Sequence, residues 1–173
     1  MSDSKIISTI RPIIIRSDKD THFTEGLSSN QFENEDITGL AGVSGVIENI
    51  IILADQQLSF EVNFYQSDTF EDDSDYDNDG YLGGITFAAA DGKQQNATGA
   101  YKYSAQKSSQ SFQPITYVDK DAADVADSAA VNGELHVTLV NRDSTSKSAG
   151  AAGEVVIIFV VRPEQFIAPE DTA

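Results

Sequence analysis

The sequence predicts an all-β protein, namely an antiparallel β-sandwich of jelly-roll type with about eight strands. Three observations lead to this fold class: several short segments alternate apolar and polar residues, others are almost continuously apolar, and no helical period of useful length appears. Glycine is frequent, at 12 residues, and proline is scarce, at 4, as expected for strands joined by turns. With 173 residues, 40% of them hydrophobic, the chain can form one domain with its own core.

The N-terminal segment, residues 1–16, contains the run Lys-Ile-Ile-Ser-Thr-Ile-Arg-Pro-Ile-Ile-Ile-Arg. Because Pro12 has no N–H to donate to a strand ladder, we expect this segment to be an edge strand or an extended arm. Its isoleucines are too apolar to remain in water, so we expect them to bury against another chain. The candidate interface residues are Ile10, Ile13, Ile14 and Ile15. Residues 17–45 are polar and lack a helical period, which predicts one long loop.

The strongest strand signal begins the predicted sandwich core, residues 46–162. Residues 46–53 are almost continuously apolar, as in a buried strand, and 55–57 form a turn. In residues 58–64 the large apolar side chains then alternate with polar ones, which predicts one buried and one exposed face. The buried face contains Leu58, Phe60, Val62 and Phe64, and we expect the two segments to pair as a hairpin.

Shorter strands are expected at residues 84–88, 99–104 and 114–118, with tyrosines facing outward. Two clearer strands end the core: one around residues 134–139, with His136 on its solvent side, and one at 154–162. Pro163 ends the last strand, so residues 163–173 are predicted to form a short C-terminal tail.

Composition and motifs argue against several classes of function. The net charge is −17, so the surface should repel nucleic acids and anionic membranes. There is no cysteine, neither of the two histidines sits in a nucleophile motif, and Gly-x-Ser-x-Gly and Walker patterns are absent. No segment reads as a secretory signal or has the length of a membrane span. We therefore expect a soluble protein that is made in a cytosol, requires no cofactor and is not an enzyme.

One acidic loop carries a metal-like motif. Asp75, Asp77 and Asp79 alternate and are followed by Gly80, like the first half of a calcium loop. The second half departs from that pattern, because Thr86 stands where a bidentate glutamate is expected. Calcium is therefore the candidate ion, and the alternative is a solvated acidic loop.

Basic residues are few, so their positions are informative. Arg142 and Lys147 lie in the small-residue turn before the last strand, and we expect them to meet an acidic neighbour at an interface. The alternative is ordinary surface charge.

Four segments carry a resemblance to a known family. Residues 135–157 read Leu-His-Val-Thr-Leu-Val-Asn-Arg-Asp-Ser-Thr-Ser-Lys-Ser-Ala-Gly-Ala-Ala-Gly-Glu-Val-Val-Ile, and they follow the segments 50–64, 81–87 and 115–119. This combination, over residues 45–161, resembles the jelly-roll capsid decoration or cement proteins of tailed bacteriophages.

The resemblance implies a virion structural protein that decorates and stabilises the outer surface of a capsid, after assembly in the host cytoplasm. The implied partners are the major capsid protein and further copies of this chain, with a trimer favoured. The alternative function is a calcium-dependent carbohydrate-binding or host-attachment module, in which Asp75, Asp77 and Asp79 hold the ion.

Overall fold

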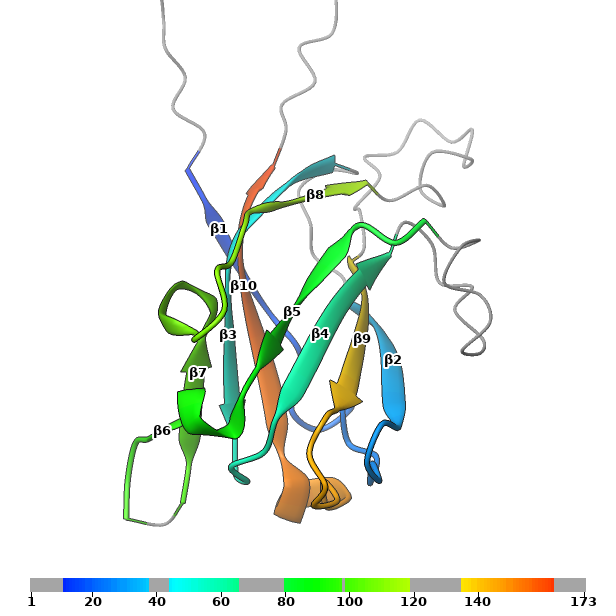
Figure 1. Ribbon diagram of the computed structural model, residues 1–173. Coiled ribbons are helices and arrows are strands. Elements are labelled where there is room, and N and C mark those ends of the chain that lie inside the picture. The colour runs from blue at the N-terminus through cyan, green and yellow to red at the C-terminus, as the bar shows by residue number, and fades with distance from the viewer. Residues whose placement is uncertain (1–10, 38–43, 66–79, 98, 119–134, 164–173) are drawn as a thin grey trace, which may run out of the picture.

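The computed structural model describes residues 11–37, 44–65, 80–97, 99–118 and 135–163, which form two antiparallel sheets packed face to face (Figure 1). The prediction of an all-β antiparallel sandwich is thus confirmed. The elements are, in order, β1 (Ile13–Arg16), β2 (Phe32–Ile37), β3 (Ser44–Ala54), β4 (Phe60–Tyr65), β5 (Gly83–Phe87), η1 (Ala89–Asp91), β6 (Lys93–Gln94), β7 (Tyr101–Ser104), η2 (Ala105–Lys107), β8 (Ile115–Val118), β9 (Leu135–Asn141), η4 (Gly150–Gly153) and β10 (Val155–Pro163).

The first four strands alternate between the two sheets, whereas β4 and β5 are neighbours in one sheet, as are β6 and β7. One sheet has six strands in the order β1-β10-β3-β7-β6, with β8 pairing the other part of β3. The second sheet has four strands in the order β2-β9-β4-β5. The antiparallel pairs are nested along the chain: β1 with β10, β2 with β9, β3 with β7 and β8, and β4 with β5.

The core lies between the sheets and is built from alternate residues of each strand. Leu58, Phe60, Val62 and Phe64 are all buried there, which confirms the predicted apolar face. The rings of Phe64 and Phe159 meet edge to face across the core, with centroids 5.7 Å apart.

The predicted hairpin of β3 and β4 is wrong, because these strands belong to different sheets. Their connection arches over the end of the core, and Tyr103 of β7 holds it. The Tyr103 hydroxyl donates to the Leu58 carbonyl oxygen (2.9 Å) and accepts from the Leu58 N–H (3.0 Å). This side chain satisfies buried backbone groups that no adjacent strand reaches.

The predicted loop at residues 17–45 is also wrong, because it contains β2 and the beginning of β3. In β2, the inward positions include Glu33 and Glu35, opposite Leu139 and Val137 of β9. These carboxylates accept hydrogen bonds from the backbone N–H groups of Glu25 and Phe23, respectively. The segment before β2 therefore covers the edge of the core, and the glutamates fasten it there.

The N-terminal segment is an edge strand of its own sheet from Ile13 onward. Within β1, Ile15 is buried in the core of its own domain, so the expectation that it buries against another chain is wrong. Ile13 packs partly against the core and is half-buried, so its place at an interface stays a prediction. Ile14 points away from the core and is 75% exposed. Ile10 lies outside the described residues.

The tyrosines were predicted to face outward, and most of them are buried. Tyr103 and Tyr117 lie in the core, where burial raises the pKa of each hydroxyl to about 12. Lys102, between Tyr101 and Tyr103, takes the outward position instead.

Candidate binding surface

The outer face of the six-stranded sheet carries a partly exposed apolar band. Alternation along β10, β3 and β1 sends every second residue away from the core. Cross-strand pairing then places Ile14 beside Val160, and Ile158 beside Ile51. We define the apolar band by these residues and their neighbour Leu53; each of them retains solvent exposure. Ile14 is 75% exposed and the other four residues are half-buried, so within the described residues the band keeps apolar surface open to solvent. Such a band is unusual in a chain whose net charge is −17.

Basic residues gather around this band. Nine lysines and arginines occur among the described residues, and five of them lie on or beside this face: Arg16, Lys93, Lys102, Lys107 and Arg162. Of these, Arg162 forms an ion pair with Glu48 of β3. The acidic chain therefore has one basic, partly apolar face.

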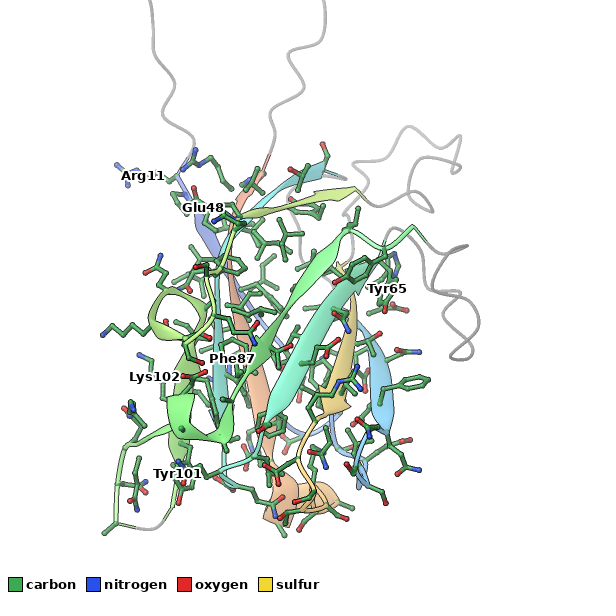
Figure 2. All side chains as sticks on the ribbon, in the orientation of Figure 1. Arg11, Glu48, Tyr65, Phe87, Tyr101 and Lys102 are labelled. Atoms are coloured by element: carbon green, nitrogen blue, oxygen red, sulfur yellow. The ribbon has the colours of Figure 1, made fainter. Side chains whose placement is uncertain are left out.

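Three of these lysines converge on a pocket of about 380 Å³, which we call the lysine pocket. Its lining residues come from β3, β7, η1, η2 and the segment around β6. Figure 1 shows β3, β6 and β7 on one side of the sandwich, and Figure 2 labels Lys102 there. The residues that line the pocket are Asn49, Ile51, Asp91, Lys93, Gln95, Lys102, Ser104 and Lys107.

Asp91 fixes the loops that carry two of the lysines. Its carboxylate accepts hydrogen bonds from the N–H groups of Ala88 and Ser109, both at 3.0 Å, and from the hydroxyls of Ser108 and Ser109. Burial would raise the pKa of Asp91, but these hydrogen bonds outweigh burial and leave the pKa below its usual value. Asp91 is thus an ionised anchor between η1 and the segment after η2.

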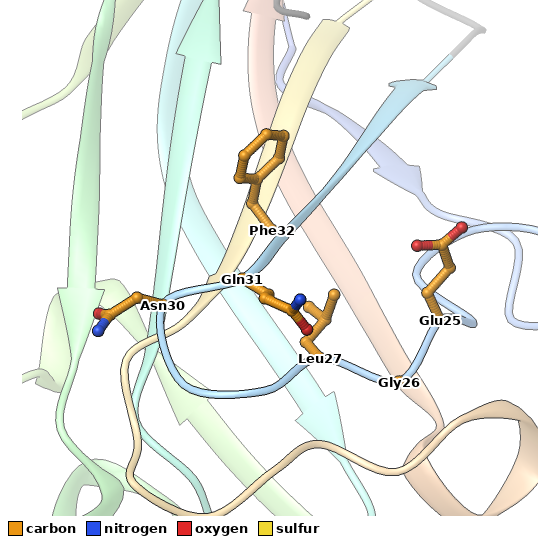
Figure 3. Close-up of a pocket in the computed structure, with 6 residues that line it drawn as sticks. All are labelled: Glu25, Gly26, Leu27, Asn30, Gln31 and Phe32. Carbon is orange, nitrogen blue, oxygen red and sulfur yellow. The ribbon is translucent and has the colours of Figure 1, made fainter. Parts of the chain in front are cut away.

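A second pocket, of about 340 Å³, lies at the end of the sandwich beside the start of β2 (Figure 3). It is lined by Glu25, Gly26, Leu27, Asn30, Gln31 and Phe32. Backbone hydrogen bonds join Leu27 to Lys147 in both directions, so this loop is tied to the turn before β10. Among the described residues that line this pocket, Glu25 is the only ionisable one, and we assign the pocket no ligand.

Lys147 was predicted to lie at an interface, and this prediction is wrong. Its side chain is fully buried, its ammonium donates to the Glu25 carbonyl oxygen, and the Glu33 carboxylate is 3.9 Å away. Burial lowers the pKa of Lys147 and raises that of Glu33. Both shifts indicate that the desolvation of the two groups outweighs the electrostatic attraction between Lys147 and Glu33, as expected for charges 3.9 Å apart.

Arg142 was the other predicted interface cation, and its partner is also within the chain. Its guanidinium donates to Glu61 at 2.7 Å and to the Asn30 side-chain oxygen at 3.0 Å. Burial would raise the pKa of Glu61, but hydrogen bonds from Arg142 and Asn63 outweigh it and lower the pKa. Arg142 therefore fastens the loop before β2 to the four-stranded sheet.

The outer face of that four-stranded sheet is polar and internally bonded. His136 was predicted to face solvent; it lies on this face, is only 5% exposed and is bonded to Asp36 at 2.8 Å. The neighbouring Thr138 hydroxyl donates to the Asn34 side chain at 2.6 Å. These contacts hold β9 to β2.

The candidate calcium ligands Asp75, Asp77 and Asp79 lie outside the described residues, so the calcium hypothesis stays a prediction. Within the described ranges, no group of three or more His, Asp or Glu side chains is arranged to hold a metal ion. The described residues also include no helix long and apolar enough to cross a membrane. Comparisons with protein-family models, curated proteins and solved structures found no match.

Sequence reasoning missed the lysine pocket. Its lysines come from β6, β7 and η2, and their spacing along the chain does not predict that they converge. One signal was available: Lys102 stands between two tyrosines in a short strand, and a strand with both rings in the core must direct the lysine outward.

Proposed function

We propose that this protein is a virion structural protein that decorates the outer surface of a phage capsid and binds it through the outer face of its six-stranded sheet. The observation that carries the proposal is the apolar band and its surrounding basic residues in an otherwise strongly acidic chain. Exposed apolar surface rimmed by charge is typical of a protein interface.

The strand order supports a jelly-roll topology. Nested antiparallel pairs, first with last and second with second-last, are what a long hairpin gives when it is rolled into two sheets. Jelly rolls are common in viral capsid proteins and also in lectins. The topology therefore supports a structural or binding protein, and the apolar band favours a protein partner over a sugar.

The charge distribution supports one particular orientation on a shell. The basic face would meet the capsid subunits, and the acidic remainder of the surface would face solvent. Like charge on neighbouring copies would then keep them from clustering except at their binding sites. A homotrimer bound to the major capsid protein is part of this proposal.

Ile14 provides the sharpest test, because it is exposed on an edge strand and a charge there should leave the fold intact. The experiment is co-sedimentation with undecorated shells of the major capsid protein that this proposal makes the partner. Burial of one isoleucine contributes about 1.5–3 kcal/mol, so Ile14→Glu should weaken binding by about 10- to 100-fold.

Gln31→Glu is the matched control, since it adds the same charge next to β2, in the other sheet. It should bind as the unmodified protein does. Absence of shell binding by the unmodified protein, or equal binding by Ile14→Glu, would refute the proposal.

A further inference from the structure

We propose that the lysine pocket is a recognition site for an acidic peptide segment of the partner protein, with Asp or Glu carboxylates seated between Lys93, Lys102 and Lys107. The inference deepens the proposed function, because it rests on docking through this face and names the chemistry of the partner there.

The first argument is a pair of like charges that does not stabilise the free protein. Lys93 of β6 and Lys102 of β7 stand directly opposite each other in the antiparallel register. Like charges at such positions repel and destabilise a sheet. A carboxylate placed between them would be attracted to both ammonium groups, and these two attractions would offset the repulsion between the lysines.

The second argument is that, among the described residues, these lysines form no ion pair with a carboxylate. The Lys93 ammonium donates to the Ala90 carbonyl oxygen at 3.1 Å, which is a neutral partner. No carboxylate of the described residues forms an ion pair with Lys102 or Lys107. Asp91 is the acidic residue of the pocket, and its two oxygens already accept four hydrogen bonds from the surrounding loops.

The third argument distinguishes a peptide from a simple anion. The side-chain oxygen of Asn49, which lines the pocket, is buried and accepts no hydrogen bond within the described residues. A buried acceptor without a donor is unfavourable, and a ligand with an N–H would satisfy it. A peptide provides N–H groups as well as carboxylates, whereas phosphate and sulfate provide only acceptors when fully ionised.

The apolar surroundings point the same way. Ile51 belongs both to the lysine pocket and to the apolar band, where it pairs with Ile158. A bound chain that extends from the pocket along the sheet would therefore contact apolar side chains. A polypeptide of acidic and apolar residues fits both parts, and a uniformly charged polyanion fits only the first.

The test uses fluorescence anisotropy with a dye-labelled, end-capped peptide of alternating Glu and Val residues, and an otherwise identical peptide with Gln for Glu. The Glu peptide should bind the full-length protein, and its affinity should fall as the salt concentration rises, since the contacts are between exposed charges. The double variant Lys93→Gln/Lys102→Gln should lose at least tenfold in affinity. Lys19→Gln, an exposed lysine paired with Asp20 elsewhere, should lose none.

A second readout separates recognition from structure. If Lys93 and Lys102 merely supported the fold, replacing them would lower the melting temperature; relief of their repulsion should instead leave it unchanged or raise it. Equal binding of the Gln peptide, or no effect of the double variant, would overturn the inference. Tighter binding of a sulfated oligosaccharide through the same lysines would also overturn it and make the pocket an anionic-glycan site.

The two proposals can fail independently. Shell binding without any binding of the Glu peptide would remove the acidic-segment inference and leave decoration standing. Lysine-dependent binding of the peptide without shell binding would remove decoration and leave an acidic-peptide site.

Discussion

The buried pair of Lys147 and Glu33 gives the most demanding test of the structure. We expect Lys147→Met, which keeps the side-chain length but removes the charge, to destabilise the protein by about 3–5 kcal/mol. The reason is that Glu33, only 6% exposed, would be left as a buried charge without its cation. Part of that loss is the hydrogen bond to the Glu25 carbonyl oxygen, about 1 kcal/mol. Urea denaturation of the full chain measures the difference.

The double variant Lys147→Met/Glu33→Gln separates the two contributions. The glutamine can still accept from the Glu25 N–H and carries no charge, so most of the stability should return. We expect the double variant to lie within about 1–2 kcal/mol of the unmodified protein, mainly because the Glu25 carbonyl still lacks its donor. Lys19→Met, at an exposed lysine, should change stability by less than about 0.5 kcal/mol. A double variant as unstable as the single one would refute this account of the pair.

Three further predictions concern the core and its connections. Because burial raises the pKa of Tyr103 to about 12, against a usual value of 10.0, the stability present below pH 10 should fall as pH rises toward 12, by about 1.4 kcal/mol per unit. Urea titrations at pH 8 and 11 should show a smaller fall in Tyr103→Phe, and an equal fall would contradict the assignment. Phe60→Ala should lose about 3–5 kcal/mol in the same assay, whereas Ile14→Ala, at an exposed site, should lose less than about 0.5 kcal/mol. Gly84→Ala would place a methyl group 2.1 Å from the side-chain oxygen of its cross-strand neighbour and should lower the melting temperature clearly. Gly26→Ala meets only ordinary contacts and serves as the control; equal melting temperatures for the two alanine variants would refute the packing argument.

Strand positions could be predicted from the sequence, while strand partners could not. The alternation around Phe60 identifies a strand with one buried side, because a period of two is a property of the strand itself. The same alternation is compatible with two arrangements: β3 beside β4 in one sheet, or β3 and β4 in the two different sheets. The structure has the second arrangement, so the predicted hairpin failed although both of its strands exist.

β2 was missed because its pattern is inverted. Its inward positions hold Glu33 and Glu35, which usually indicate a solvent-facing side. They are accommodated because backbone N–H groups of the preceding segment reach them, a contact between parts of the chain that no local pattern reveals. Lys147 was misjudged for the same reason, since its partners come from residues more than a hundred positions earlier.

The position of β10 also bears on how the protein folds during its synthesis. β10 lies between β1 and β3, so until it arrives β1 lacks its pairing partner in the six-stranded sheet, and β3 can pair only along its other edge, with β7 and β8. Of the strands that the structure describes, β10 is made last, and β1 is made first. Pairings between such distant segments are slow to form, and the edges of β1 and β3 that bond to β10 remain unpaired while the ribosome completes the chain. A stalled or prematurely terminated chain that lacks β10 would therefore expose the unpaired edge of β3, a place where further chains can add, and removing β10 should be far more harmful than removing the edge strand β1.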